Sequence, residues 1–117
     1  MDGREWLGSY RERLQEIRTR TVSAQQALAG AAGTATSRDG AVIVTVDPAG
    51  ALQHLVLAQS ADLLTRVQLA DAVLDTARRA RQEAVRQAEA ALVPVLGEHS
   101  EAMAVVRTHL AGPGEEW

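Results

Sequence analysis

The longest apolar repeat of the chain runs through its first thirty residues. Side chains suited to a helix interface recur there in alternating steps of three and four. The series is Leu7, Tyr10, Leu14, Ile17, Thr21, Ala24 and Leu28. Such a heptad seam is typical of a helix that packs against another helix. It predicts one helix over residues 2–29, about 40 Å long at ~1.5 Å per residue, so part of this helix should project and contact a partner.

A block of strand-like sequence follows. Residues 41–47, AVIVTVD, alternate between two sets of side chains, as in a strand with two different faces. The turn sequences Asp39-Gly40 and Asp47-Pro48-Ala49-Gly50 flank this segment. Residues 52–57 supply a returning strand, and residues 35–37 a weaker third one. Three short strands bury too little apolar surface to be stable alone, so helices must cover this sheet.

The second half of the chain reads as helix. Thr65 and Gln68 fit a capping box, which predicts a helix over residues 66–93 after a loop at 59–64. Its apolar stripe is bulky at first and almost entirely alanine from Ala77 onward, so that half must pack by close approach or stay partly solvated. Pro94 should disrupt this helix or kink it, and residues 95–110 form a shorter one.

Glycines mark the end of the first helix. Gly30-Ala31-Ala32-Gly33 follows its last apolar positions. Because glycine adopts the left-handed conformation that often caps a helix, we expect this segment to supply the C-terminal cap.

Composition narrows the class of protein. The chain has 117 residues, the size of one domain, with 46% hydrophobic residues and a net charge of −3. It lacks cysteine, which excludes disulfides and thiolate metal sites. No apolar run is long enough for a membrane span, and the N-terminus lacks the order of a signal peptide. We therefore expect a cytoplasmic protein with no membrane partner.

Two groups of arginines are candidates for binding phosphate. The first, Arg11, Arg13, Arg18 and Arg20, outnumbers the two glutamates in the same stretch and leaves a local balance of +2. The second, Arg78, Arg79, Arg81 and Arg86, shares its helix with four acidic residues. Each group has two interpretations. It is either a stripe that contacts phosphates or a solvent-exposed face whose arginines form ion pairs with nearby acids.

Catalytic chemistry has no sequence support. The chain contains no nucleophile elbow, no phosphate-binding glycine loop and no zinc-binding pattern, and its three histidines are widely separated. We expect no enzyme activity, no cofactor, no metal and no small-molecule substrate.

The order of these elements resembles the YbaB/EbfC family of nucleoid-associated DNA-binding proteins, in particular its actinobacterial branch. The resemblance spans residues 5–90. It is carried by residues 39–50, DGAVIVTVDPAG, the strand 52–57 and the helix segment 69–80, LADAVLDTARRA. It implies an α+β subunit with a three-stranded antiparallel sheet, a tweezer-shaped homodimer with projecting helices, and weakly sequence-specific binding of double-stranded DNA in nucleoid organisation.

These observations combine into one hypothesis. We expect an α-β-β-β-α domain over residues 1–93 and a C-terminal helical extension with a flexible tail over 94–117. Both arginine groups would contact phosphates. The predicted dimer interface comprises Leu7, Tyr10, Leu14, Ile17, Val42, Val44 and Val46. The alternative is a protein–protein adaptor, for example one associated with a secretion system, that keeps the fold without binding DNA. It would use the heptad helix or the extension, with Trp117 as an anchor.

Overall fold

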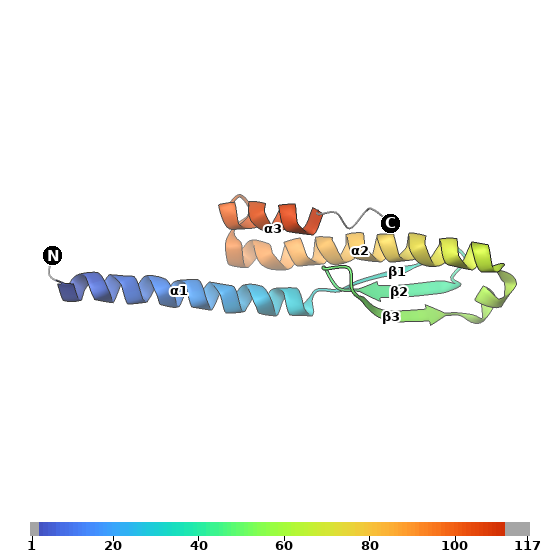
Figure 1. Ribbon diagram of the computed structural model, residues 1–117, viewed down its shortest axis with the longest axis horizontal. Coiled ribbons are helices and arrows are strands. Elements are labelled where there is room, and N and C mark those ends of the chain that lie inside the picture. The colour runs from blue at the N-terminus through green and yellow to red at the C-terminus, as the bar shows by residue number, and fades with distance from the viewer. Residues whose placement is uncertain (1–2, 112–117) are drawn as a thin grey trace.

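The computed structural model describes residues 3–111, which form a sheet with one long helix lying along it and another extending from its end (Figure 1). The elements are α1 (Gly3–Gly30), β1 (Gly33–Thr36), β2 (Val42–Val46), β3 (Leu52–Leu57), the 3₁₀ helix η1 (Gln59–Leu63), α2 (Arg66–Leu96) and α3 (Glu101–Ala111). The predicted α+β class and its antiparallel three-stranded sheet are confirmed. The segment after β3 is a 3₁₀ helix rather than the expected loop.

The sheet has the strand order β1-β2-β3, with both pairs antiparallel. Its register follows the predicted alternation, because Ala35 faces Val44 on one side of β2 and Leu55 faces it on the other. The turn after β2 closes with a hydrogen bond from the Gly50 N–H to the Asp47 carbonyl at 2.9 Å. Gly50 has a φ of 92°, a conformation that glycine adopts without strain.

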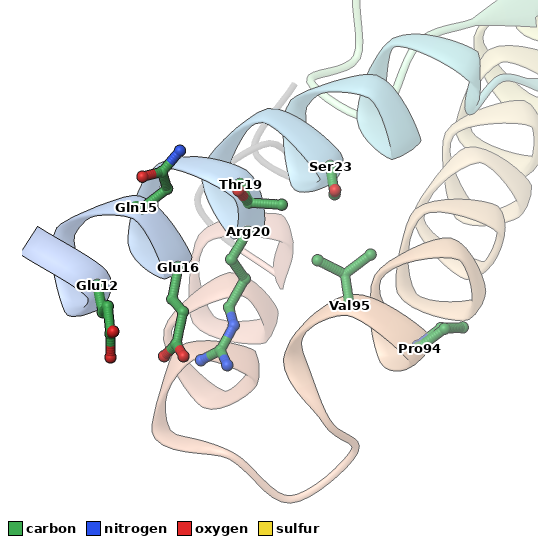
Figure 2. Close-up of a pocket in the computed structure, with 8 residues that line it drawn as sticks. All are labelled: Glu12, Gln15, Glu16, Thr19, Arg20, Ser23, Pro94 and Val95. Atoms are coloured by element: carbon green, nitrogen blue, oxygen red, sulfur yellow. The ribbon is translucent and has the colours of Figure 1, made fainter.

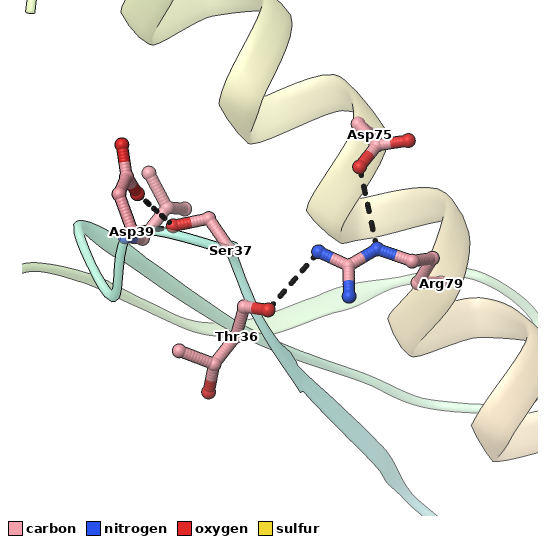
Figure 3. A network of polar contacts seen from close by, with 6 residues as sticks. Thr36, Ser37, Asp39, Asp75 and Arg79 are labelled. Carbon is pink, nitrogen blue, oxygen red and sulfur yellow. Dashed lines mark hydrogen bonds and ion pairs between the residues drawn. The ribbon is translucent and has the colours of Figure 1, made fainter.

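The turn between β1 and β2 is held by the carboxylate of Asp39 (Figure 3). This group accepts hydrogen bonds from the Ser37 hydroxyl at 2.7 Å and from the Ala41 N–H at 3.0 Å. The Ser37 hydroxyl oxygen in turn accepts from the Val42 N–H at 3.0 Å. The bond from Ser37, and then that from Ala41, lower the pKa of Asp39 below its ordinary value. The charged form therefore stabilises the start of β2.

The core lies where α2 crosses β1 and β2. Val42, Val44 and Val46 are buried there together with Ala80 and Ala84 of α2. The alanine half of α2 thus packs by close approach, since alanine lets the helix backbone come near the strand.

Gly33 shows how close this approach is. A Cβ atom at Gly33 would meet the backbone of α2 at the Ala80 carbonyl and at Ala84, with the Ala84 Cα only 2.9 Å away. The expected left-handed cap is wrong, because positive φ angles in the described residues occur only at Gly40, Gly50 and Gly97. Gly33 is needed for space, not for its φ angle.

Strand β3 lies outside this core. Its cross-strand partners show that Leu55 and Leu57 share the sheet face of Val44 and Val42. All of its residues are nevertheless exposed, because the contacts of α2 with the sheet are concentrated on β1 and β2. One strand of the sheet therefore presents apolar side chains to solvent.

Helix α2 begins at the predicted capping box. The Thr65 hydroxyl oxygen accepts from the Gln68 N–H at 3.1 Å, and the Thr65 N–H donates to the Gln68 side-chain oxygen at 2.9 Å. The predicted end is wrong, since Pro94 lies inside α2, which continues to Leu96. The chain then reverses at Gly97, with a φ of 87°.

Helix α3 folds back along α2 (Figure 1). It begins at Glu101 rather than at the predicted residue 95, and its Met103 side chain is fully buried. The Arg81 guanidinium on α2 donates to the Leu110 carbonyl at 2.9 Å, where the last carbonyls of a helix lack internal partners. The extension up to residue 111 is thus part of the folded body, whereas Trp117, the expected anchor, lies outside the described residues.

The N-terminal part of α1 projects from this body (Figure 1). Every residue from 3 to 22 is exposed, and the first partly buried residues are Ser23 and Ala24. The structure measures 76 Å along its longest axis but only 23 and 18 Å across. We call residues 3–22 the arm. The expected projection of the first helix is confirmed.

Candidate nucleic-acid interface

The arginines of α2 are largely engaged within the chain. The Arg79 Nε lies 3.3 Å from a carboxylate oxygen of Asp75, which stands four residues earlier on α2. The Nη2 atom of Arg79 donates to the Thr36 carbonyl at 3.0 Å (Figure 3). Arg79 therefore fastens α2 to the end of β1.

Arg86 is engaged on its own helix. It donates to Glu83 from Nε at 3.1 Å, and Gln87 donates to the other oxygen of this carboxylate at 3.0 Å. The bond from Gln87, followed by the bond and the charge of Arg86, lowers the pKa of Glu83. With Arg81 bound to the end of α3, Arg78 is the exposed member of the group for which the described chain provides no partner.

The arginines of the arm are placed differently. Arg11, Arg13, Arg18 and Arg20 are all exposed, and none has an ion pair or hydrogen bond among the described residues. In helical projection at 100° per residue, the acids Glu12 and Glu16 lie opposite the heptad seam, whereas the four arginines lie on its two flanks. The four arginines therefore flank the seam on both sides, and Arg20 also lies on the same side of α1 as Glu16.

A cleft lies where the arm meets the end of α2. It has a volume of about 640 Å³ and is bounded across from the arm by Pro94 and Val95. Glu12, Glu16 and Arg20 point from α1 to the same side (Figure 2). Because both carboxylates and a guanidinium share this cleft, it has no strong charge of one sign, so it is a weak candidate for a phosphate site.

The two arginine groups do not converge within one chain. Arg79 is bound at the end of β1, beside the sheet, whereas the arm extends beyond the far end of α2 (Figure 1). The sequence pattern predicted the same role, contact with phosphates, for all eight arginines. The acids at Asp75 and Glu83 were a local signal for the pairing of Arg79 and Arg86. Glu16 has the same i,i+4 spacing to Arg20, however, and forms no ion pair among residues 3–111. The bonds of Arg79 and Arg81 to distant carbonyls carried no sequence signal.

The predicted interface residues also separate into two classes. Leu7, Tyr10, Leu14 and Ile17 are exposed on the arm. In contrast, the three valines of β2 are buried under α2 within a single chain. Their assignment to a surface between subunits is therefore corrected: the alternation located a buried face correctly, but α2 covers it.

No group of three or more potential metal ligands is found among residues 3–111. The helices in this described part include none with the length and apolarity to cross a membrane.

A sequence model of the YbaB/EbfC DNA-binding family matches residues 5–99. The chain belongs to the YbaB/EbfC family. The match extends past the predicted domain boundary at residue 94 and so includes the last turn of α2. Neither the curated proteins nor the solved structures contain a significant match to the chain.

Proposed function

We propose that this YbaB/EbfC protein forms a homodimer that binds double-stranded DNA non-enzymatically and with weak sequence preference, in the nucleoid of the cytoplasm. Family membership supports DNA as the ligand. The observation that carries the proposal is the exposure of Arg11, Arg13, Arg18 and Arg20, for which residues 3–111 provide no ion pair. Contacts from these side chains to phosphates would position the protein without reading bases.

The negative net charge of the chain does not oppose this proposal. Charges farther apart than about 10 Å are largely screened at 0.1 M salt. The arm projects from the body that carries most of the acids. A phosphate beside the arm therefore responds mainly to the local balance, four arginines against two glutamates over residues 11–20. Arg78 would add a contact from α2.

The homodimer is proposed to form along β3. This edge strand exposes Leu52, Leu55, Val56 and Leu57, with exposed fractions from 43% to 58%. An edge strand with unpaired backbone groups and apolar side chains is a ready surface for another strand. A second copy could add its own β3 and cover the part of the sheet that α2 leaves open.

Arm contacts to DNA can be tested by fluorescence anisotropy with a random-sequence duplex at about 50 and 200 mM salt, where phosphate-driven binding weakens by orders of magnitude. Replacing Arg11 and Arg18 by alanine removes four charges per dimer. The slope of log K against log salt should then become shallower by about 3–4, at ~0.9 per phosphate contact. Arg66→Ala with Arg107→Ala removes the same charge away from the arm and should change the slope much less. Absence of binding at the lower salt concentration would refute DNA binding.

The dimer interface needs a separate test. Val56→Lys places a charge on the exposed surface of β3 and should convert the dimer to a monomer, as measured by size-exclusion chromatography with light scattering. Val105 is a matched control, because it is an exposed valine on α3; Val105→Lys should leave the dimer intact. A Val56→Lys protein that stays dimeric would place the interface elsewhere.

The alternative of a protein adaptor finds its support at α1 rather than at the C-terminal extension. Helix α3 already uses Met103 against α2, and Arg81 binds its last turn. The apolar side chains of the arm have no such cover. An interaction site for a protein therefore fits the arm better than the extension.

A further inference from the structure

The arm presents an apolar seam that phosphate binding does not use. Leu7, Tyr10, Leu14 and Ile17 form it, with exposed fractions of 45%, 49%, 37% and 61%. Trp6 stacks on Tyr10, with ring centroids 5.5 Å apart and planes inclined by 8°, and so enlarges the apolar surface near the end of the arm. Guanidinium contacts to phosphates would leave these side chains exposed to water.

The seam has the geometry of one half of a coiled coil. With Leu7 and Leu14 at heptad position a, Tyr10 and Ile17 occupy position d. These are the positions that insert between the side chains of a facing helix. At ~1.5 Å per residue, the seam from Leu7 to Ile17 offers about 15 Å of such surface.

The flanks of the seam determine which helix can face it. In this heptad assignment Arg11 and Arg18 occupy e positions, and Arg13 and Arg20 occupy g positions. Residues at e and g contact the partner helix and set its identity and orientation. From Tyr10 to Arg20 both flanks carry only arginine, whereas the acids occupy positions remote from the seam.

A second copy of the arm is a poor occupant. In a parallel pair, g of one helix faces e of the next heptad on the other, so Arg13 would face Arg18. In an antiparallel pair, e faces e and g faces g, so arginine would again face arginine. Like charges at these positions disfavour pairing in either orientation.

We propose that the arm docks an amphipathic helix of a partner protein, with aliphatic residues at its a and d positions and Asp or Glu at its e and g positions. The aliphatic side chains would cover the seam, and the carboxylates would pair with the arginines on both flanks. This inference does not depend on DNA binding, because the seam is required for the helix and not for phosphate contacts.

The test uses two synthetic three-heptad peptides with Ile at a and Leu at d. One carries Glu at every e and g position, and the other carries Lys there. The full-length protein should bind the labelled Glu peptide saturably in fluorescence anisotropy, and at least ~10-fold more tightly than the Lys peptide, since opposite charges face each other only with the former. Replacing both Arg11 and Arg18 by Glu should reduce this preference or reverse it.

Variants of the seam distinguish a partner helix from DNA or a second copy of the chain as the molecule that binds there. Leu14→Ser with Ile17→Ser should weaken binding of the Glu peptide at least ~10-fold, because the apolar contact is lost, while the affinity for duplex DNA stays unchanged. Val22 is an exposed aliphatic residue off the seam, so Val22→Ser is the matched control and should retain peptide binding. Both replacements alter exposed side chains, and circular dichroism verifies the fold.

Three results would overturn the proposal. The first is no binding of the Glu peptide, or equal binding of both peptides. The second is loss of duplex binding in the seam variant, which would make the seam part of a nucleic-acid surface. The third is conversion of a dimer to a monomer by the seam variant in sedimentation, which would make a second copy the occupant.

Discussion

Replacing Gly33 by alanine tests how closely α2 lies on β1. The added methyl group would overlap the Ala80 carbonyl and the backbone of Ala84. These are backbone atoms of a long helix, so no side chain can rotate to make room. The strand and the helix would have to move apart along the fully buried alanine stripe, which includes Ala80, Ala84 and Ala88.

The size of the effect follows from two opposing contributions. Overpacking typically costs 1–3 kcal/mol and occasionally more; a clash with backbone atoms belongs at the upper end, about 3 kcal/mol. Alanine also restricts the unfolded chain and returns roughly 0.5–1 kcal/mol. The net loss in the free energy of unfolding should be at least about 2 kcal/mol, a large part of the roughly 5–15 kcal/mol of a typical domain. At about 4 °C per kcal/mol, the melting temperature should fall by about 8 °C.

Thermal and urea unfolding followed by circular dichroism at 222 nm measures this loss. Proteins must be compared at equal concentration, because a dimer gains apparent stability as concentration rises. Gly30 is the matched control, since a Cβ atom there meets nothing within 4 Å. We expect Gly30→Ala to melt near the wild-type temperature. A Gly33→Ala protein that melts within about 2 °C of wild type would refute the close contact between α2 and β1, since even 1 kcal/mol should shift it further.

Three further predictions concern other parts of the fold. Thr65→Ala removes the N-cap of α2 and should lower the free energy of unfolding by about 1 kcal/mol; an unchanged urea midpoint would contradict a role for this cap. Met103→Ala should loosen α3 from α2 and speed amide hydrogen exchange in α3 more than in β2, whereas equal protection would show that α3 is held by other contacts. The Asp39 carboxyl should titrate below its ordinary pKa of 3.8 in an NMR titration. The charged carboxylate contributes fully to stability above pH 3.8, and this contribution is lost as the pH falls through the lowered pKa of Asp39. Asp39→Asn should therefore make the free energy of unfolding less dependent on pH in this acidic range. A titration midpoint of Asp39 at or above 3.8 would contradict the hydrogen bonds of the turn.

Local patterns predicted several elements well. The capping box at Thr65 and Gln68 and the turn at Asp47–Gly50 depend on neighbours within four positions along the chain. The register of β2 follows from its alternation. The heptad steps of α1 depend only on helical geometry, and the arm is therefore where the sequence expected it.

The interface predictions were harder, because burial depends on what packs above a residue. The valines of β2 form an apolar face in the sequence, yet nothing local shows that α2 covers this face while β3 stays open. Pro94 lies inside α2, whose last turn continues past it to Leu96, and α3 packs back on this helix. The sequence pattern could not include that packing.

The arginines also show which features depend on local sequence and which depend on the tertiary structure. The sequence by itself determined where positive charge is dense and that a heptad seam runs between its two rows. Only the tertiary structure decided that Arg79 and Arg81 bind the carbonyls of Thr36 and Leu110, while the arginines of the arm remain exposed. The physical reason is the sequence separation over which each interaction acts. Helical spacing and turn chemistry depend on residues a few positions apart. The partner of a buried methyl group or of a guanidinium comes from a distant part of the chain that only the fold brings close.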